Sequence, residues 1–407
     1  MRVAVLGAGF QGTCIALELA SRGVEVDLYD QDEQPITRSG FVNEGRIHLG
    51  FNYANDPSLR TASLMVKGAL LFRRNLNRWI DFDAELENCS ESVIFAVHRD
   101  SLVSAERFRS YFGQVGKCVT EMLSSEGGDY LGGDGSFLFE ELNSAEVEEI
   151  FDPRLVSAAF RALERAIPVI SVAERLREAV TTSAICFRPH SRVEGVGRKN
   201  GKFRVDIGGE NGGASNNYDQ VVNALWAGRL AVDADLGYPA ERAWLHRFKY
   251  GVFIDPCDPA ARPPSVAITC GPFGDIVRYA DGSLYLSWYP ACLKAISAEL
   301  HPPILPVVPD APTSRRIFED TWKELSTVCP ALGPQPPFDE CRMVVRGGVI
   351  VAWGQSDIDE ADSELHARGD VGTFSENGYH SVNTGKYTLA PMLAVEVGER
   401  ICSAAEA

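Results

Sequence analysis

The first thirty residues constrain the fold most, because they predict a strand, a glycine-rich turn, a helix and a second strand. Residues 3–6 form a short apolar run that is typical of a strand buried on both faces of a parallel sheet. Gly7, Gly9 and Gly12 follow in the pattern G-x-G-x-x-G, and the second strand ends at Asp30. In such a unit the turn lets a pyrophosphate approach the helix start, and the acid binds a ribose diol. The opening therefore predicts a dinucleotide site; the alternative is a plain βαβ unit whose glycines serve only tight packing.

Length, composition and charge narrow the possible classes of protein. With 407 residues, 45% hydrophobic and 23% charged, the chain has an ordinary globular composition and room for two domains. We expect neither a signal peptide nor a membrane span, because no apolar run reaches the roughly 18 residues that cross a bilayer. A net charge of −17 disfavours a nucleic-acid partner. The ten cysteines occur singly, which predicts reduced thiols, a cytoplasmic location and no metal site.

The segment after the second strand is long, irregular and polar, and such a segment inside a compact domain is usually functional. It ends in N-E-G-R-I-H-L-G-F-N-Y at residues 43–53. Together with the opening GAGFQG, this segment resembles the FAD-dependent oxidoreductases of the D-amino-acid oxidase superfamily. The form of the motif is most similar to the branch that oxidises 2-hydroxyglutarate and glycerol-3-phosphate. The resemblance implies that the segment runs along the pyrophosphate and under the isoalloxazine ring of FAD.

Several residues of this segment acquire expected roles from the resemblance. Thr37, Arg38 and Ser39 would lie near the phosphates, and residues 43–47 beside the flavin. His48 would lie close to the ring and the substrate, where an imidazole can take the hydroxyl or ammonium proton. The alternative for His48 is a neutral imidazole that bonds a backbone carbonyl and holds the loop in shape.

The C-terminal segment SVNTGKYTLAPMLAVEVGERI resembles the family's T-G-K-x-T segment, in which backbone amides at a helix start reach the flavin C2 carbonyl. The resemblance assigns Gly385, Lys386, Tyr387 and Thr388 to cofactor binding, with Lys386 and the helix dipole stabilising the anionic reduced flavin. The alternative is that these residues only cap the helix. An NAD enzyme has no reason for a second helix start at its nucleotide, so the two ends of the chain together favour FAD. An acid at position 30 with no adjacent arginine also argues against NADP.

Two further segments resemble the family more weakly. YDQVVNALWAGR is similar to its D-x-V-V-N-A-x-G-x-W-A stretch, which returns the chain to the pyrophosphate and places Ala224 there. Leu225 and Trp226 stand where the family usually has glycine and a neighbour, which argues against an equally close backbone approach. In the helix predicted over residues 171–180, the backbone of Val172 is expected to touch the adenine.

The expected substrate residues come mostly from strands in the second half of the chain. Arg346 interrupts the apolar run RMVVRGGVIVAW, and in the family an arginine near here commonly meets the substrate carboxylate. The equal alternative is an arginine paired with an internal acid. Arg278 is a second candidate for an anionic substrate, and Tyr53 and Tyr289 are expected to face it.

The expected fold is α/β, with a Rossmann-like FAD-binding domain and an inserted antiparallel β-sheet substrate domain. The FAD-binding domain is predicted at residues 1–85, 145–240 and 340–407, and the substrate domain at residues 86–144 and 241–339. The first domain combines a parallel sheet with a small antiparallel meander, expected near residues 192–196, 202–207 and 219–224. A helix is predicted over residues 143–166.

The expected reaction passes a hydride from a CH–NH or CH–OH group of a small polar molecule to flavin N5, and this molecule is expected to carry a carboxylate. His48 or a water takes the proton, and dioxygen or an electron carrier reoxidises the flavin. The alternatives are an NAD-dependent dehydrogenase and a non-catalytic FAD-binding protein. The expected site has His48 and Arg346 as catalytic residues and Arg278, Tyr53 and Tyr289 at the substrate. The cofactor set is Gly7, Gly9, Phe10, Gln11, Gly12, Asp30, Gln31, Arg38, Ser39, Asn43, Gly45, Arg46, Ile47, Val172, Ala224, Gly385, Lys386, Tyr387 and Thr388.

Overall fold

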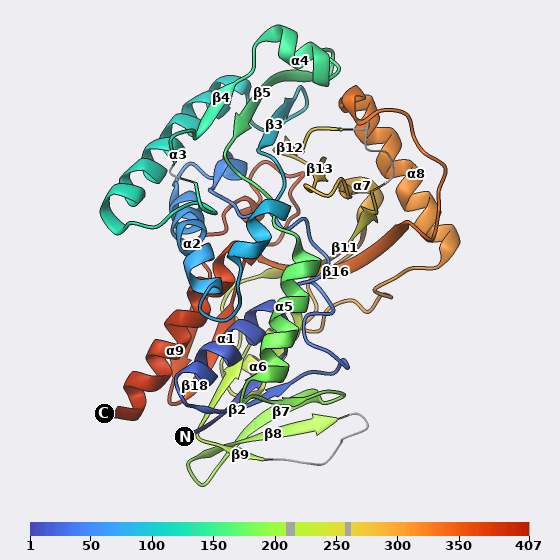
Figure 1. Cartoon of the computed structure of the whole chain (residues 1–407). Coiled ribbons are helices and arrows are strands. Elements are labelled where there is room, and N and C mark those ends of the chain that lie inside the picture. The colour runs from blue at the N-terminus through green and yellow to red at the C-terminus, as the bar shows by residue number, and fades with distance from the viewer. Residues whose placement is uncertain (134, 209–215, 257–261, 407) are drawn as a thin grey trace.

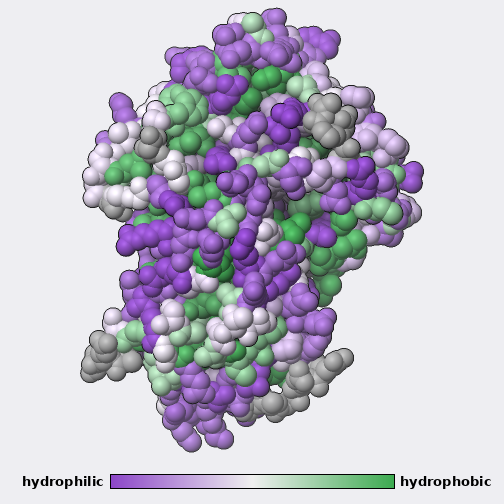
Figure 2. Space-filling model, viewed as in Figure 1, coloured by the Kyte–Doolittle hydropathy of each residue, from purple (hydrophilic) through white to green (hydrophobic). Residues whose placement is uncertain are grey.

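The computed structural model describes residues 1–133, 135–208, 216–256 and 262–406. Two large sheets and a three-stranded sheet form its framework, with helices packed around them (Figure 1). The face seen in Figure 2 is mainly hydrophilic, and apolar side chains are visible there only in separate patches. None of the helices in the described ranges combines the length and the apolar character that a membrane span requires.

The six-stranded sheet gathers strands from the beginning, the middle and the end of the chain, in the order β17-β18-β10-β1-β2-β6. All of its neighbouring strands run parallel except β17 and β18. The central strands are apolar and buried on both faces, as in other parallel sheets. Its members are β1 (Arg2–Leu6), β2 (Glu25–Tyr29), β6 (Cys186–Arg188), β10 (Gln220–Asn223), β17 (Gly372–Glu376) and β18 (Tyr379–Asn383).

Helices from distant parts of the chain pack beside this sheet. The helix α1 contacts both α5 and α9, and α2 contacts α9 and α3. The buried carboxylate of Glu18 on α1 accepts hydrogen bonds from Arg22, Arg78 and Trp79, which ties α1 to the segment after α2. These helices are α1 (Phe10–Ser21), α2 (Arg60–Leu76), α3 (Ala105–Glu126), α5 (Val169–Thr182) and α9 (Ala390–Glu406).

The nine-stranded sheet is largely antiparallel and lies in the upper half of Figure 1. Its order is β15-β11-β14-β13-β12-β3-β5-β4, with β16 paired to β11 along its whole length. The one parallel pair in this order is β12 with β3. Its strands are β3 (Val93–His98), β4 (Phe139–Glu141), β5 (Val156–Ala162), β11 (Trp244–Ile254), β12 (Val266–Thr269), β13 (Gly274–Arg278), β14 (Leu284–Trp288), β15 (Leu293–Ser297) and β16 (Met343–Trp353).

Helix α8 (Ala311–Val328) covers part of this sheet with Phe318, Trp322 and Leu325, which join the buried side chains of β11 and β14 in one core cluster. The shorter helices are α4 (Ser144–Ile150), α6 (Arg229–Asp235) and α7 (Tyr289–Cys292). The parallel sheet and the separate antiparallel sheet agree with the predicted fold class.

Two predicted elements differ from the structure. The helix predicted over residues 143–166 stops at Ile150, because Asp152 precedes Pro153 and a residue before proline avoids the helical conformation. The chain then forms β5, which pairs with β3 in the nine-stranded sheet although it falls in the range 145–240.

The third strand of the meander is also shifted. The small sheet consists of β7 (Arg192–Lys199), β8 (Lys202–Gly208) and β9 (Asn217–Tyr218). Residues 220–223 instead form β10 beside β1, because Val221 and Val222 are apolar and fully buried on opposite faces of the parallel sheet. The domain boundaries themselves stay a prediction.

Candidate active site

A cavity of about 1020 Å³ opens at the carboxyl ends of β1, β2 and β10 and extends to β11, β14 and β16 of the other sheet. Parallel α/β sheets commonly bind ligands at this edge. The volume is at the upper end of the roughly 300–1000 Å³ that small-molecule and cofactor sites occupy. The cavity therefore offers room for a molecule that spans both sheets.

The glycine turn forms one end of this cavity. Gly7 has φ +91°, and a Cβ on Gly12 would lie 1.8 Å from the carbonyl oxygen of Gly7, so both positions require glycine. A Cβ on Gly9 would meet nothing within 4 Å, which shows open space above the turn. Gly9 is also the N-cap of α1 and supplies no capping side chain. The free N–H groups of the first helical turn thus face a cradle that fits a pyrophosphate.

Asp30 closes this end of the cavity. Its carboxylate accepts the backbone N–H of Ala8 at 2.7 Å and that of Asp32 at 3.0 Å. Burial raises the pKa of Asp30 above its ordinary value, against the effect of these two hydrogen bonds. Arg38 also lines the cavity, and its guanidinium makes a bidentate contact with Asp32 at 2.7 and 2.8 Å. Asp32 therefore fixes the position of Arg38 near the predicted phosphate region.

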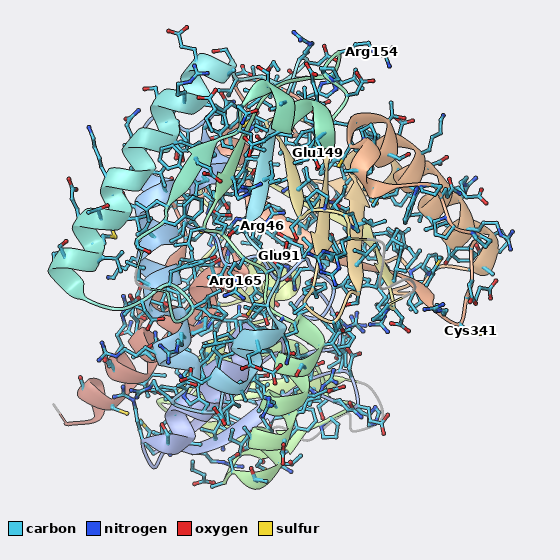
Figure 3. All side chains as sticks on the ribbon, turned by 45° about the horizontal axis from the view of Figure 1, so that its top comes forward. Arg46, Glu91, Glu149, Arg154, Arg165 and Cys341 are labelled. Carbon is cyan, nitrogen blue, oxygen red and sulfur yellow. The ribbon has the colours of Figure 1, made fainter. Side chains whose placement is uncertain are left out.

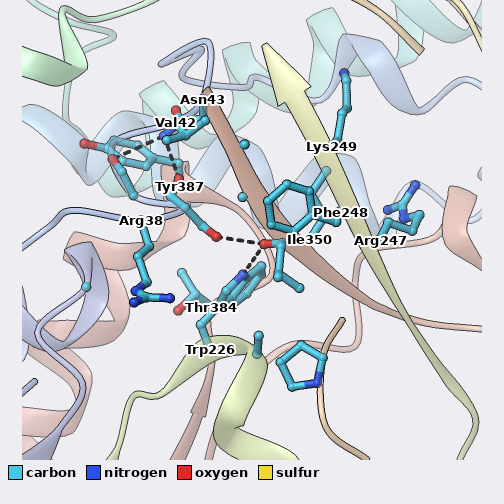
Figure 4. Close-up of a pocket in the computed structure, with 18 of the residues that line it drawn as sticks. Arg38, Val42, Asn43, Trp226, Arg247, Phe248, Lys249, Ile350, Thr384 and Tyr387 are labelled. Atoms are coloured by element: carbon cyan, nitrogen blue, oxygen red, sulfur yellow. Dashed lines mark hydrogen bonds between the residues drawn. The ribbon is translucent and has the colours of Figure 1, made fainter. Parts of the chain in front are cut away.

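The loop over residues 39–48 forms the middle of the cavity (Figure 4). Asn43 shapes it, because its amide donates to the carbonyls of Ser39 and Gly40 while its oxygen accepts the N–H of Gly45. The backbone N–H of His48 donates to the hydroxyl of Thr388 at 2.9 Å. This bond joins the loop to the turn that precedes the C-terminal helix.

Tyr387 lies at that helix start, in the turn η6 (Tyr387–Leu389). Its ring stacks on Phe10 of α1, with a centroid distance of 3.8 Å and an interplanar angle of 9°. Its hydroxyl is buried and, among the described residues, has no hydrogen-bond partner. Both ends of the chain thus meet at the cavity.

The imidazole of His48 lies between two carboxylates rather than against a backbone carbonyl. Its Nδ1 is 3.4 Å from Oε2 of Glu164, and its Nε2 is 3.7 Å from Oε1 of Glu44. Glu164 is buried, whereas Glu44 lines the cavity. Burial acts to raise the pKa of Glu44, but the nearby His48 ring and the charges of Lys386 and Arg46 hold it well below its usual range. Glu44 is therefore a carboxylate at ordinary pH.

The end of the cavity on the nine-stranded sheet is strongly cationic. Arg46, which Figure 3 shows in the middle of the molecule, pairs with Asp275 at 2.7 Å. Arg247 donates to the hydroxyl of Tyr289 at 2.8 Å and to Asp357 at 3.2 Å. Burial raises the pKa of Tyr289 to about 12.

Lys249 adds a further cation on the same strand as Arg247. Its Nζ donates to the hydroxyl of Ser287 at 3.1 Å and lies 5.5 Å from the centre of the Tyr289 ring. These side chains extend the cationic end of the cavity along β11.

Three further polar side chains at this end make no hydrogen bond or ion pair with another described residue. Among the described residues, the Arg368 guanidinium donates no hydrogen bond and forms no ion pair, and the buried hydroxyl of Tyr53 also has no partner. The Nζ of Lys386 lies 5.9 Å from the centre of the Tyr53 ring. Burial lowers the pKa of Arg368 to about 10, and the Arg247 charge contributes in the same direction.

Burial also lowers the pKa of the neighbouring Lys386. Burial lowers the pKa of its ammonium group to about 8; Glu44 opposes this shift, and Arg368 and Arg247 add to it. A group that is cationic near neutral pH thus faces the cavity beside Arg368.

Most of the predicted site residues meet at this cavity. Those that line it are Gly7, Gly9, Phe10, Gln11, Asp30, Gln31, Arg38, Ser39, Asn43, Arg46, His48, Tyr53, Ala224, Tyr289, Gly385, Lys386 and Tyr387. Gly12, Gly45, Ile47 and Thr388 are not among the lining residues, although their contacts shape the turn and the loop.

Three predicted residues are placed elsewhere. Val172 is fully buried in the core of α5. Arg278 donates to the carbonyl of Pro263 at 3.0 Å and pairs with Glu91 at 2.7 Å. The Arg346 guanidinium lies 5.0 Å from the ring of Phe41. None of the three is among the residues that line the cavity.

The sequence did not indicate Arg247, Lys249, Arg368 or Glu164 as site residues, and it placed Glu44 beside the flavin without giving it a role. The sequence does contain a pattern that could have indicated Arg247 and Lys249. They occupy alternate positions of the otherwise largely apolar strand β11, so their side chains share one face of the sheet. Arg368 lies in an irregular segment and Glu164 just after β5, where local patterns carry no such signal.

Comparisons with known proteins bear on the family and the fold of the chain. The family model described as FAD dependent oxidoreductase, DAO, matches residues 2–400. The glycine oxidase of Geobacillus kaustophilus has a similar structure, with 14% identity and a TM-score of 0.68 over 99% of this chain and 95% of that one. The FAD-bound L-alpha-glycerophosphate oxidase of Mycoplasma pneumoniae is similar at 12% identity and a TM-score of 0.67, over 98% and 93%.

A sequence relative covers a shorter stretch. An FAD-dependent monooxygenase of Fusarium mangiferae is 28% identical over 118 residues, which is 29% of this chain and 30% of that protein. The chain thus matches less than a third of the length of this relative. At the identities of the solved structures, the likeness shows a shared fold.

Proposed function

The chain belongs to the DAO family of FAD-dependent oxidoreductases, and we propose that it oxidises a CH–NH or CH–OH group of a small polar substrate that carries an acidic group. The observation that carries this proposal is the cationic end of the cavity, with Arg368, Lys386 and Tyr53 facing it. FAD is the cofactor of this family, so the NAD-dependent and non-catalytic alternatives are not retained.

The residues around the cavity fit an FAD molecule. We assign the ribose to Asp30, the pyrophosphate to the open turn at Gly9, and the ring to the region between Asn43 and Lys386. When bound, FAD supplies a flavin ring that accepts two electrons. The protein contributes the binding, the orientation and the charges around that ring.

The acidic group of the substrate would bind at Arg368, Lys386 and Tyr53. A partly buried guanidinium or ammonium group without a partner is costly, and a carboxylate on the substrate removes that cost. Arg368 can bind it in a bidentate manner, while the Tyr53 hydroxyl donates a further hydrogen bond. This assignment replaces Arg346 and Arg278, which do not line the cavity.

His48 would accept the proton that leaves the substrate nitrogen or oxygen as the C–H hydride is transferred. Glu164 faces Nδ1 and favours the tautomer with hydrogen on that nitrogen, which leaves Nε2 free to accept a proton at the cavity. Glu44 lies beside Nε2 and stabilises the imidazolium that results. Dioxygen or an electron carrier would then accept the two electrons from the reduced cofactor.

An anaerobic substrate panel tests this function. The purified FAD-loaded protein is mixed with amino acids and hydroxy acids, and with the amide or ester of each, while the absorption of oxidised flavin is followed. We expect bleaching with at least one acid and a much slower reaction with its neutral derivative. If the neutral derivative reacts as fast as the acid, the assignment of an acidic substrate is wrong.

A further inference from the structure

Trp226 has an unusual backbone conformation at the cavity. It has φ +53°, in the left-handed region that favours glycine. It begins the turn η3 (Trp226–Gly228), directly after the carboxyl end of β10. A bulky residue keeps this conformation only where its surroundings determine it, and such positions are common at ligand clamps. The contacts of its side chain are therefore informative.

The indole of Trp226 is bound to the opposite sheet (Figure 4). Its Nε1 donates to the carbonyl oxygen of Val349 on β16 at 2.7 Å, and the hydroxyl of Ser39 donates to the same oxygen at 2.9 Å. Ser39 lies in the loop after β2, so two loops of the six-stranded sheet share one acceptor on the nine-stranded sheet. We call Ser39, Trp226 and Val349 the latch.

Residues next to Val349 and next to Trp226 hold the latch in place. A Cβ on Gly348 would lie 3.0 Å from the hydroxyl oxygen of Ser39, so glycine allows the close approach of that loop to β16. On the other side, the amide of Asn223 donates to the carbonyl of Arg229 and to Asp233, and its oxygen accepts the N–H of Leu225. The loop that presents Trp226 is therefore held at both ends.

All three latch residues line the cavity, which extends from Asp30 at one end to Lys386 at the other. A dinucleotide that occupied both ends would lie against these residues. We infer that the latch holds the cofactor in place and slows its exchange with solvent, with the Trp226 indole as the closing element. This role concerns cofactor retention and is separate from the oxidation proposed above.

The rate of FAD release tests the latch without any substrate. The FAD-loaded protein is diluted, and free FAD is followed by its fluorescence. We expect Trp226→Gly, which removes the indole and suits a positive φ, to release FAD at least tenfold faster than the unmodified protein. Trp226→Phe keeps a ring but loses the N–H donor, and we expect an intermediate rate.

Ser39→Ala should also accelerate the release of FAD. Its effect should be smaller in the Trp226→Phe background, because both donors bind the carbonyl oxygen of Val349.

Trp244→Phe is a matched control, since its indole donates to the carbonyl of Glu299 at 3.2 Å and Trp244 is not among the cavity-lining residues. Its rate should equal that of the unmodified protein. Equal release rates for the unmodified protein, Trp226→Phe and Ser39→Ala would overturn the latch, whether or not Trp226→Gly folds. Because no substrate is present, that result would leave the proposed oxidation untouched.

Discussion

The Nδ1 atom of His48 lies 3.4 Å from Oε2 of Glu164, a fully buried carboxylate that follows β5 of the nine-stranded sheet. The other oxygen of Glu164 accepts the backbone N–H of Leu49 at 2.7 Å and that of Phe51 at 3.3 Å. One carboxylate thus anchors the loop beyond His48 and faces its ring. This relationship decides which nitrogen of His48 is turned toward the cavity.

Replacement of His48 tests its role as proton acceptor. We expect His48→Asn to lower kcat by about 10²- to 10⁴-fold, which is the usual contribution of general acid–base catalysis. The backbone N–H that donates to Thr388 is retained, so FAD content should not change. Anaerobic stopped-flow measurement of flavin reduction checks the rate. An unchanged rate would show that a water molecule or another residue takes the proton.

Glu164→Gln tests the positioning of the imidazole. The variant keeps a carbonyl oxygen for the two backbone N–H groups but removes the charge that faces Nδ1. A carboxylate charge 3.4 Å from Nδ1 stabilises an imidazolium by a few kcal/mol at the effective dielectric constant of a protein, so we expect a roughly 10- to 150-fold lower kcat. Thermal unfolding of Glu164→Gln and Glu164→Ala serves as the control, because only the second also loses the loop anchor. An equal loss of Tm in both variants, with kcat of the Gln form unchanged, would assign Glu164 a purely structural role.

The residues at the end of the cavity that we assign to the cofactor could be predicted to lie together because their motifs are local. The glycine turn lies within six residues, and Asn43 and His48 lie on one loop, so sequence spacing alone fixes their neighbours. The substrate half is assembled from β11, the segment before β17 and the C-terminal turn, which only the tertiary structure brings together.

Arg346 illustrates what local patterns cannot provide. The strand that contains Arg346 was predicted from the sequence. On β16, Arg346 lies four residues from Ile350, and Ile350 lines the cavity and is paired with Arg247 on β11. Four residues correspond to about 13 Å along a strand, far enough for the Phe41 ring to cover the Arg346 guanidinium instead. The register between β11 and β16 decides which arginine faces the cavity.

A comparison of Arg368→Met with Arg346→Met separates the structure-based assignment from the sequence-based one. Loss of one charged hydrogen bond of about 1.5–3 kcal/mol should raise KM for an acidic substrate roughly 10- to 150-fold in Arg368→Met. Arg346→Met should change KM by less than about threefold, because its guanidinium lies outside the cavity. Steady-state kinetics check both values. The opposite ranking would return the acid-binding role to Arg346.

The lowered pKa of Lys386 predicts a pH dependence of substrate binding. Its ammonium group has a pKa of about 8, so it is cationic below that pH and neutral above it. We therefore expect KM for an acidic substrate to rise as the pH increases through about 8. In Lys386→Met, KM should be high already at pH 7 and should not change between roughly pH 7 and 9. A rise of KM in this variant equal to that of the unmodified protein would assign the titration to another group.

Gly9 and Gly12 lie three residues apart in the same turn, and alanine at each should have a different effect. A Cβ on Gly12 would lie 1.8 Å from the Gly7 carbonyl oxygen, so Gly12→Ala has to displace α1 from β1. This substitution should lower the stability of the cofactor-free protein by about 1–3 kcal/mol or more.

Gly9 has φ −65° and ψ 179°, a conformation that alanine readily adopts, and its Cβ would point into open space. Gly9→Ala should therefore keep the Tm of the cofactor-free protein. Its methyl group would occupy the space assigned to the pyrophosphate, so the Kd for FAD should rise at least about tenfold, or 1.4 kcal/mol. Calorimetry of the cofactor-free proteins and FAD titration check the pair; normal FAD affinity in Gly9→Ala would place the pyrophosphate away from this turn.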